Sequence, residues 1–171
     1  MEYNKEKYKA EFNKLLKLKS DRKFFIRKST DTFKINKFIQ KGNDSLDLAR
    51  SIKDSKAKAK YYWTITICYY AMLYAAKAAV LSKGFETDDH YSTQIALGHL
   101  FVPERIEKED LELLDQAYKI FEVDYVEYFD DARKESSVSR YNPTKVYNER
   151  RVTEIYDKAK KFIAKINNIL N

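Results

Sequence analysis

The sequence predicts an all-α protein, an up-and-down bundle of four to five main helices plus a short helix. Of its 171 residues only three are glycine, at positions 42, 84 and 98, and two are proline, at 103 and 143. Such a scarcity of helix breakers favours long helices joined by short connections. Apolar residues also recur three and four positions apart along most of the chain. Hydrophobic residues make up 44% of the sequence, which is enough for a packed core and excludes a disordered chain.

The first predicted helix is basic and amphipathic and runs from residue 3 to about residue 25, because its apolar residues recur at helical spacing. Residues 29–31 (Ser, Thr and Asp) offer N-cap side chains for a second helix, which is expected to end at about Asp54. Gly42 is expected to dent this second helix near its middle.

The third predicted helix, about residues 56–83, is apolar almost all round and should be the centre of the bundle. Residues 61–81 carry one charge in 21 positions and are long enough to span a bilayer. Lys77, five tyrosines and the lack of a second such segment favour a buried core helix instead. The aromatic residues at 61–63 are compatible both with packing and with dimer contacts. Gly84 is expected to end this helix in the left-handed conformation.

Three further elements follow. A short helix is predicted from His90 to about residue 100, and Pro103 should close it. A long, acidic helix is predicted from there to about residue 134. The Asn-Pro pair at residues 142–143 indicates a turn. The last helix is expected over residues 149–170, where apolar residues line one face.

We expect a single domain over residues 1–171, with a basic N-terminal helical extension over residues 1–30 and the bundle over 31–171. The net charge of +7 is unevenly distributed: residues 1–60 carry 18 Lys or Arg against 8 Asp or Glu, whereas residues 104–135 carry 5 against 12. Such blocks either attract one another within a fold or dimer, or present a basic face to nucleic acid. The plainer explanation, solvated faces of a Lys-rich protein, is equally open.

Cys68 is the only cysteine, so no disulfide forms within the chain, and a cytoplasmic location is expected. Its apolar neighbours indicate a core residue. His90 and His99 stand nine residues apart beside Asp88 and Asp89. Zinc sites use three or four ligands at tighter spacing, which favours an Asp-capped helix N-terminus over a metal site. We expect no metal and no cofactor, and the absence of a glycine-rich phosphate loop makes an ATP-using enzyme a poor candidate.

Residues 68–90, CYYAMLYAAKAAVLSKGFETDDH, resemble the core of HEPN-domain proteins. His90 falls where many relatives carry a His just after this helix, and residues 132–141, ARKESSVSRY, lie where relatives place an R-x-x-A-x-Y-like segment. The resemblance covers about residues 34–170. The matching core positions are Tyr69, Tyr70, Ala71, Met72, Ala75, Ala76, Leu81 and Gly84.

The resemblance implies a HEPN-like bundle that forms a homodimer and is often paired with a minimal nucleotidyltransferase. Catalytic HEPN members are metal-independent ribonucleases with an Arg and a His four to six positions beyond it. The His can take the 2′-hydroxyl proton, and the Arg can stabilise the charge on the phosphate. In this sequence residues 137–140, which lie four to seven positions beyond Arg133, are Ser, Val, Ser and Arg, and none of them is a His. Serine hydroxyls do not titrate near neutral pH, so nuclease activity should be weak or absent.

Arg133, Lys134, Arg140 and Tyr141 are the candidate phosphate- or nucleic-acid-binding residues, since cations can clamp phosphate and an aromatic ring can stack on a base. Arg133 and Lys134 are equally explained as cations at a helix C-terminus. Arg140 and Tyr141 are equally explained by a turn in which Tyr141 packs under the last helix. In some relatives a Tyr near the motif accepts a nucleotide from the nucleotidyltransferase, a role that the resemblance would give to Tyr141.

Three functions stay open at this point. The first is a HEPN-type component of a toxin–antitoxin or defence module that binds RNA or nucleotide, without a membrane. The second is a non-catalytic adaptor bundle that binds a protein partner. The third is an active metal-independent endoribonuclease with a non-standard base, whose catalytic candidates are Arg133, Arg140, Tyr141 and His90. It requires His90 to lie close to the two arginines, directly or across a dimer.

Overall fold

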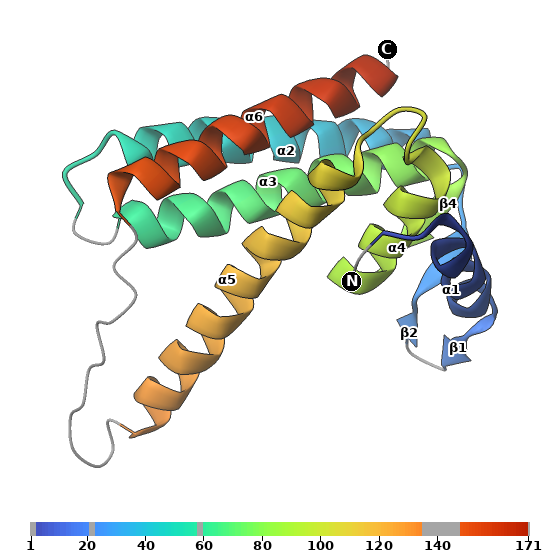
Figure 1. The fold of residues 1–171 in the computed structure, drawn as a ribbon, viewed down its shortest axis with the longest axis horizontal. Coiled ribbons are helices and arrows are strands. Elements are labelled where there is room, and N and C mark those ends of the chain that lie inside the picture. The colour runs from blue at the N-terminus through green and yellow to red at the C-terminus, as the bar shows by residue number, and fades with distance from the viewer. Residues whose placement is uncertain (1–2, 21–22, 58–59, 135–147, 171) are drawn as a thin grey trace.

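The computed structural model describes residues 3–20, 23–57, 60–134 and 148–170, without side chains at 19–20, 23–24 and 122–134. Six helices dominate this part of the chain and confirm the predicted all-α fold (Figure 1). The helices are α1 (Lys5–Lys17), α2 (Thr32–Lys53), α3 (Lys60–Ser82), α4 (His90–Phe101), α5 (Lys108–Lys134) and α6 (Glu149–Leu170). Four short strands are β1 (Lys19–Ser20), β2 (Lys23–Phe24), β3 (Ile26–Lys28) and β4 (Phe85–Thr87).

The helix α3 is the centre of the bundle. Figure 1 shows α2, α3 and α6 side by side, with α5 crossing α3 obliquely. α2 and α6 make the most extensive contacts with α3. α1 and α4 lie together at one end of the bundle, whereas α2 ends and α3 and α6 begin at the opposite end (Figure 1). The C-terminal part of α5 extends away from the other helices (Figure 1).

The packing of α2 on α3 depends on small residues. Ala71 and Ala75 of α3 are buried, and a Cβ at Gly42 would lie 3.2 Å from the carbonyl oxygen of Ala71. α2 runs unbroken through Gly42. Glycine costs about 1 kcal/mol of helix propensity, and the close approach of α2 to the buried helix α3 outweighs this cost.

The composition of α3 meets the length and apolarity of a membrane span. Most of its apolar window is nevertheless covered by the neighbouring helices, with buried residues on nearly every side. Helices that are apolar all round are typical of the core of a folded domain. In this structure α3 is the predicted buried core helix.

The predicted first helix is wrong beyond Lys17. α1 ends there, and Leu18 takes an extended conformation (φ −73°, ψ 120°). Strand β3 then pairs antiparallel with β4, with Ile26 opposite Thr87. The run Phe-Phe-Ile at residues 24–26 favours a strand. Local periodicity did not show this, because the pairing partner lies far along the chain.

The helix α1 closes one side of the core. Its residues Tyr8, Phe12 and Leu15 are buried, and the helix packs mainly on α4. These three residues belong to the same hydrophobic cluster as the core residues of α3, α5 and α6. α1, the helix of the predicted basic extension, is therefore docked onto the bundle.

Gly84 ends α3 as predicted. Its φ of 82° lies in the left-handed region that glycine adopts without strain. Its N–H donates to the carbonyl of Leu81 (2.9 Å), and its own carbonyl accepts from the N–H of Ser29 (2.9 Å). The same glycine therefore stops the central helix and starts the β3–β4 pairing.

The start of α4 also agrees with the prediction. Asp89 is the N-cap and accepts a hydrogen bond from the N–H of Ser92 (2.8 Å). The hydroxyl of Ser92 accepts in return from the N–H of Asp89 (3.2 Å), which completes a capping box. This geometry explains why the helix begins at His90.

The start of α5 was placed too early, because the helix begins at Lys108 and not at Pro103. The Asp110 carboxylate accepts from the N–H of Glu107 (3.0 Å) and from Nζ of Lys165 on α6 (2.9 Å). A side chain that bonds the backbone just ahead of a helix fixes where that helix starts. The ion pair with α6 is a tertiary contact, which local sequence does not reveal.

The last helix, α6, has the predicted bounds. The Asn148 side chain accepts from the N–H of Arg151 (2.9 Å) and caps its first turn. Its apolar stripe faces the core, and its charged face lies outward. The buried residues are Val152, Ile155, Tyr156, Ala159, Phe162, Ile163 and Ile166.

Candidate nucleic-acid interface

The structure describes only part of the predicted phosphate site. Arg133 and Lys134 are the last two residues of α5, and their side chains are outside the described part. Arg140 and Tyr141 lie in residues 135–147, which are also outside it. The geometry of these four residues therefore remains a prediction.

His90, the fourth catalytic candidate, is a buried aromatic packing residue. Its ring stacks on Tyr118 with centroids 3.9 Å apart and an interplanar angle of 9°. The ring of Tyr69 also lies close to the His90 ring, with the two centroids 5.7 Å apart. The side chain is 8% exposed, and neither ring nitrogen has a hydrogen-bond partner within the described residues. Burial lowers the pKa of His90 to about 4, with Asp115 and Asp89 opposing the shift, so the ring is neutral at pH 7.

Within one chain His90 and Arg133 are far apart. His90 packs on Tyr118, and Arg133 lies fifteen residues further along α5. At 1.5 Å per residue this separation is about 22 Å along the helix axis. A general base must lie within hydrogen-bond reach of the proton that it takes. His90 could therefore serve an Arg133 site only if a second chain brought the two together.

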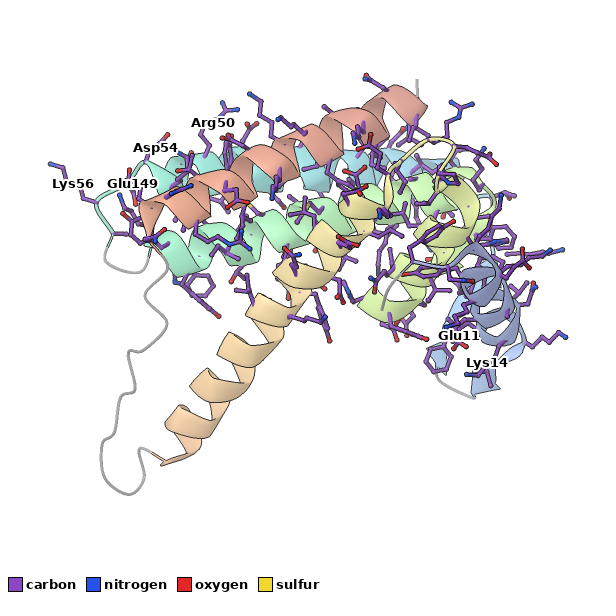
Figure 2. All side chains as sticks on the ribbon, viewed as in Figure 1. Glu11, Lys14, Arg50, Asp54, Lys56 and Glu149 are labelled. Carbon is purple, nitrogen blue, oxygen red and sulfur yellow. The ribbon has the colours of Figure 1, made fainter. Side chains whose placement is uncertain are left out.

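Basic and aromatic side chains gather where α2 ends and α3 and α6 begin, a region that we call the basic/aromatic end. Figure 2 shows Arg50, Lys56 and Glu149 at this end of the bundle. The basic/aromatic end comprises Arg50, Lys53, Lys56, Lys60, Tyr61, Tyr62, Trp63, Arg150, Arg151 and Tyr156.

Tyr156 joins α2 to α6 at this end. Its hydroxyl accepts a hydrogen bond from Nε of Arg50 (3.0 Å). Nζ of Lys53 lies 5.7 Å from the centre of its ring, a cation–π distance. The hydrogen bond to the phenol is the main cause of the raised pKa of Arg50. Tyr156 therefore holds two cations of α2 in place.

Some of the cations are neutralised and others are not. Lys53 pairs with Asp54 (2.7 Å), and Arg151 pairs with Glu154 (3.0 Å). No acidic partner within the described part of the chain pairs with Lys56, Lys60 or Arg150. These three cations are available to an anionic partner such as phosphate.

Trp63 is the most exposed aromatic residue of α3. Its side chain is 51% exposed, although most of that helix is buried. The Tyr62 ring meets it edge-on, with centroids 5.2 Å apart, and Nζ of Lys60 lies 5.2 Å from the Tyr61 ring. An exposed indole next to an unpaired ammonium group offers a base-stacking surface beside a phosphate contact. The run KYYW at residues 60–63 carries this signal in the sequence, but only the fold shows that its Trp faces outward.

The HEPN domain family matches residues 35–169 of this chain, which covers α2 to α6. The chain is a HEPN-domain protein. The family that residues 68–90 indicated is therefore confirmed, and the match extends over nearly the whole bundle. No curated protein matches the sequence significantly.

At the level of the family, a HEPN domain indicates a role that is related to nucleases or RNA, or a role of the toxin–antitoxin type. The matched range begins inside α2, so α1 and strands β1 to β3 lie outside it. The basic/aromatic end lies wholly within the matched range. The described part of that end carries cations that suit an anionic partner, and it holds no histidine that could move a proton.

The two histidines of this HEPN domain do not form a metal site with each other. His90, the first residue of α4, stacks on Tyr118 of α5. His99 packs against Phe12 of α1, and the centroids of these two rings are 4.7 Å apart. In the part of the chain that the structure describes, no three His, Cys, Asp or Glu side chains gather around a possible ion. Each histidine therefore has its own aromatic packing partner.

Proposed function

We propose that this protein is a HEPN-type component of a toxin–antitoxin or defence module that binds RNA or nucleotide at the basic/aromatic end. The observation that supports this most strongly is the exposed Trp63 ring close in sequence to Lys56 and Lys60, two cations without an acidic partner in the described chain. Single-stranded nucleic acid is bound by this combination, because bases stack on aromatic rings while ammonium groups contact phosphates.

The proposal includes weak or absent nuclease activity. RNA cleavage without a metal needs a group that takes the 2′-hydroxyl proton. His90 is neutral at pH 7 and so has a free nitrogen lone pair, but it is buried and lies about 22 Å along α5 from Arg133. Binding without cleavage is the behaviour that this arrangement supports.

The residues predicted from the sequence extend the same proposal. Arg133, Lys134 and Arg140 would add phosphate contacts, and Tyr141 would add a stacking ring or accept a nucleotide from a partner nucleotidyltransferase. All four lie between the acidic stretch of α5 and the start of α6. A homodimer, which the HEPN resemblance implies, would bring two such sets to one RNA and raise affinity through a second contact.

The test combines a cleavage and a binding measurement on the same RNA. The full-length protein is incubated with labelled single-stranded and hairpin RNA in EDTA, cleavage is followed on gels, and binding by fluorescence anisotropy. We expect binding to single-stranded RNA that weakens with salt, and intact RNA. Trp63→Ala and Lys56→Ala/Lys60→Ala should weaken binding. Phe33→Ala is the matched control, because Phe33 is 68% exposed and also has a lysine over its ring.

The alternatives give different results. Cleavage that disappears in Arg133→Ala/Arg140→Ala would favour the active endoribonuclease with a non-standard base. An absence of binding at low salt would favour the adaptor bundle that binds a protein partner. Equal weakening by Phe33→Ala and Trp63→Ala would contradict a specific surface at the basic/aromatic end.

A further inference from the structure

A pocket of about 240 Å³ lies between the N-terminal segment, α4 and α5. α1 and α4 meet at the end of the bundle opposite the basic/aromatic end (Figure 1). The N-terminal segment supplies Tyr3 and Tyr8 to the pocket, α4 supplies Gln94, and α5 supplies Glu112 and Asp115. One wall therefore comes from a part of the chain that the HEPN family match does not cover.

Two buried polar side chains line this pocket without a hydrogen-bond partner among the described residues. Tyr8 is 1% exposed and Gln94 is 6% exposed. Neither the Tyr8 hydroxyl nor the Gln94 amide belongs to the fully enclosed unpaired atoms, which are nitrogens of His90 and His99. Both groups are therefore reached from the pocket that they line. Buried polar groups of this kind are normally satisfied by protein, water or a ligand.

The aromatic wall of the pocket is fixed in place. The Tyr3 and Tyr8 rings are tilted by 50° with centroids 5.1 Å apart. The Tyr3 hydroxyl donates to the carbonyl of Val102 (2.9 Å), which anchors that ring. The Tyr8 ring lies so close to the backbone of α4 that a Cβ at Gly98 would overlap it. Tyrosine rings attract cations electrostatically, and a wall that is already ordered lowers the cost of binding one.

The rim of the pocket has one carboxylate more than its lysines neutralise. Lys119 pairs with Asp115 (2.6 Å), and Lys108 lies 3.8 Å from Glu109. Glu112 is exposed and has no cationic partner in the described chain. A ligand that carries a positive charge would complete the pairing of these charges.

The electrostatic field at the aromatic wall also favours a cation. Burial is the main cause of the raised pKa of Tyr8, followed by the charge of Asp115, and Glu112 contributes as well. The pKa of Tyr3 is raised by burial and then by Glu104. The charged groups that act on the two phenols are thus acidic. A negative field of this kind attracts cationic ligands and repels anionic ones.

We propose that this pocket binds a guanidinium group, carried either by a small molecule or by an arginine side chain of a peptide. The Glu112 carboxylate would accept two parallel N–H bonds from it, the strongest geometry for this ion pair. The planar cation would lie against the Tyr3 ring. Its remaining N–H groups would donate to the oxygens of Tyr8 and Gln94. Guanidinium has several N–H donors and no acceptor, so it matches a site whose free groups are oxygens.

This inference does not depend on the proposed function. The pocket and the basic/aromatic end involve different parts of the fold and ligands of opposite charge. Trp63 reports on the basic/aromatic end, and the Gln94 side-chain amide reports on the pocket. The loss of one binding activity should leave the other in place.

The experiment titrates the full-length protein with four small compounds of similar shape: butylguanidinium, butylammonium, butanol and butyrate. Binding is followed by calorimetry and by NMR of the side-chain amides and the indole. We expect saturable binding of butylguanidinium that shifts the Gln94 amide and leaves the Trp63 indole signal unchanged. Butylammonium should bind several-fold more weakly, because it lacks the planar fork. Butanol and butyrate should not bind.

Glu112→Gln is the decisive variant, since it keeps the shape of an exposed side chain and removes its charge. It should weaken butylguanidinium binding by about tenfold or more. Glu149→Gln makes the same change at the other end of the bundle (Figure 2) and should have no effect. Gln94→Leu should also weaken binding several-fold and repeats the test from another wall of the pocket. Circular dichroism confirms that each variant is folded.

A second titration separates the two sources of the guanidinium group. A capped tripeptide with arginine between two glycines is compared with butylguanidinium. Tighter binding of the tripeptide supports an arginine side chain, and tighter binding of butylguanidinium supports a small molecule. No saturable binding of either compound, equal affinity of Glu112→Gln and wild type, or equal affinity for butylguanidinium and butyrate would each overturn the proposal.

Discussion

The ring of His90 lies flat against the ring of Tyr118, with centroids 3.9 Å apart and planes within 9° of parallel. The contact joins the first residue of α4 to the middle of α5. Both imidazole nitrogens are enclosed and lack a hydrogen-bond partner among the described side chains and backbone groups. His90 therefore acts in this chain as a neutral aromatic packing residue. It matches the position of a histidine in many HEPN relatives, but this match does not by itself make it a catalytic residue.

The stability of the protein should fall as the pH drops through the titration range of His90. The folded-state pKa of about 4 lies below the ordinary value of 6.5, because burial disfavours the charged ring. Above pH 6.5 the ring is neutral in both states and its stabilising packing is fully present. Between pH 6.5 and 4 the unfolded chain takes up a proton that the folded protein excludes, which costs stability on the order of 3 kcal/mol. Urea denaturation across this pH range measures the effect.

The control for this prediction is His90→Phe, which keeps an aromatic ring against Tyr118 but does not titrate. The variant should lose less stability than the wild type between pH 6.5 and 4, whatever its absolute stability. Carboxylates such as Asp115 and Asp89 are present in both proteins and largely cancel in the difference. Identical pH dependence of the two proteins would show that His90 is not the group responsible.

Replacing Gly98 by Ala should destabilise the protein by up to about 2 kcal/mol. Alanine gains about 1 kcal/mol of helix propensity, but its Cβ would overlap the buried Tyr8 ring and approach Leu111 to 3.0 Å. Overpacking of this kind costs about 1–3 kcal/mol. Gly42→Ala is the comparison, because its Cβ would meet its nearest neighbour at 3.2 Å. Thermal denaturation should show a larger loss for Gly98→Ala, and the reverse order would contradict the docking of α1 through Tyr8.

Cys68 should be unreactive in the folded protein. The side chain is completely buried in α3, and burial raises the pKa of its thiol to about 12. Only the thiolate attacks disulfide reagents at a useful rate. A disulfide reagent at mildly alkaline pH should therefore label the protein only after a denaturant is added. Rapid labelling without denaturant, at the rate of a free thiol, would show that α3 opens readily or is packed differently.

Lys60 and Trp63 should change RNA binding in different ways. Lys60→Ala removes one phosphate contact and should reduce the slope of log affinity against log salt by about 0.7. Trp63→Ala removes a stacking surface worth about 1–3 kcal/mol and should leave that slope unchanged. Anisotropy titrations at several salt concentrations give both quantities. A changed slope in Trp63→Ala would mean that the exposed indole positions a cation and does not stack on a base.

Several elements of the fold were predicted because their signals are local. The bounds of α6 follow from an apolar stripe that repeats every three to four residues. The end of α3 follows from Gly84, whose left-handed conformation glycine adopts without strain. The capping of α4 by Asp89 follows from a short polar side chain directly before the helix.

Other elements depend on partners far along the chain. The first helix was predicted to run to about residue 25, yet α1 ends at Lys17, and β3 pairs with β4, which lies beyond α2 and α3 in the chain. The start of α5 depends on Asp110, which is held by Lys165 of α6. Local periodicity does not show which distant groups will form hydrogen bonds with a backbone or side-chain group. The end of the first helix and the start of α5 were therefore misplaced.

The candidate sites divide in the same way. The sequence contained KYYW at residues 60–63 and a Tyr at position 8, and it indicated the HEPN family through residues 68–90. It did not show that Trp63 is 51% exposed while Tyr8 is 1% exposed.

The sequence by itself therefore determined the helical class, the central helix and the family, because these depend on composition and on periodicity within single helices. The tertiary structure decided which side chains face solvent, which line a pocket and which pack together. His90 is the plainest case: its position in the sequence is compatible with a catalytic base, and the stacking on Tyr118, a residue of another helix, makes it a buried packing residue.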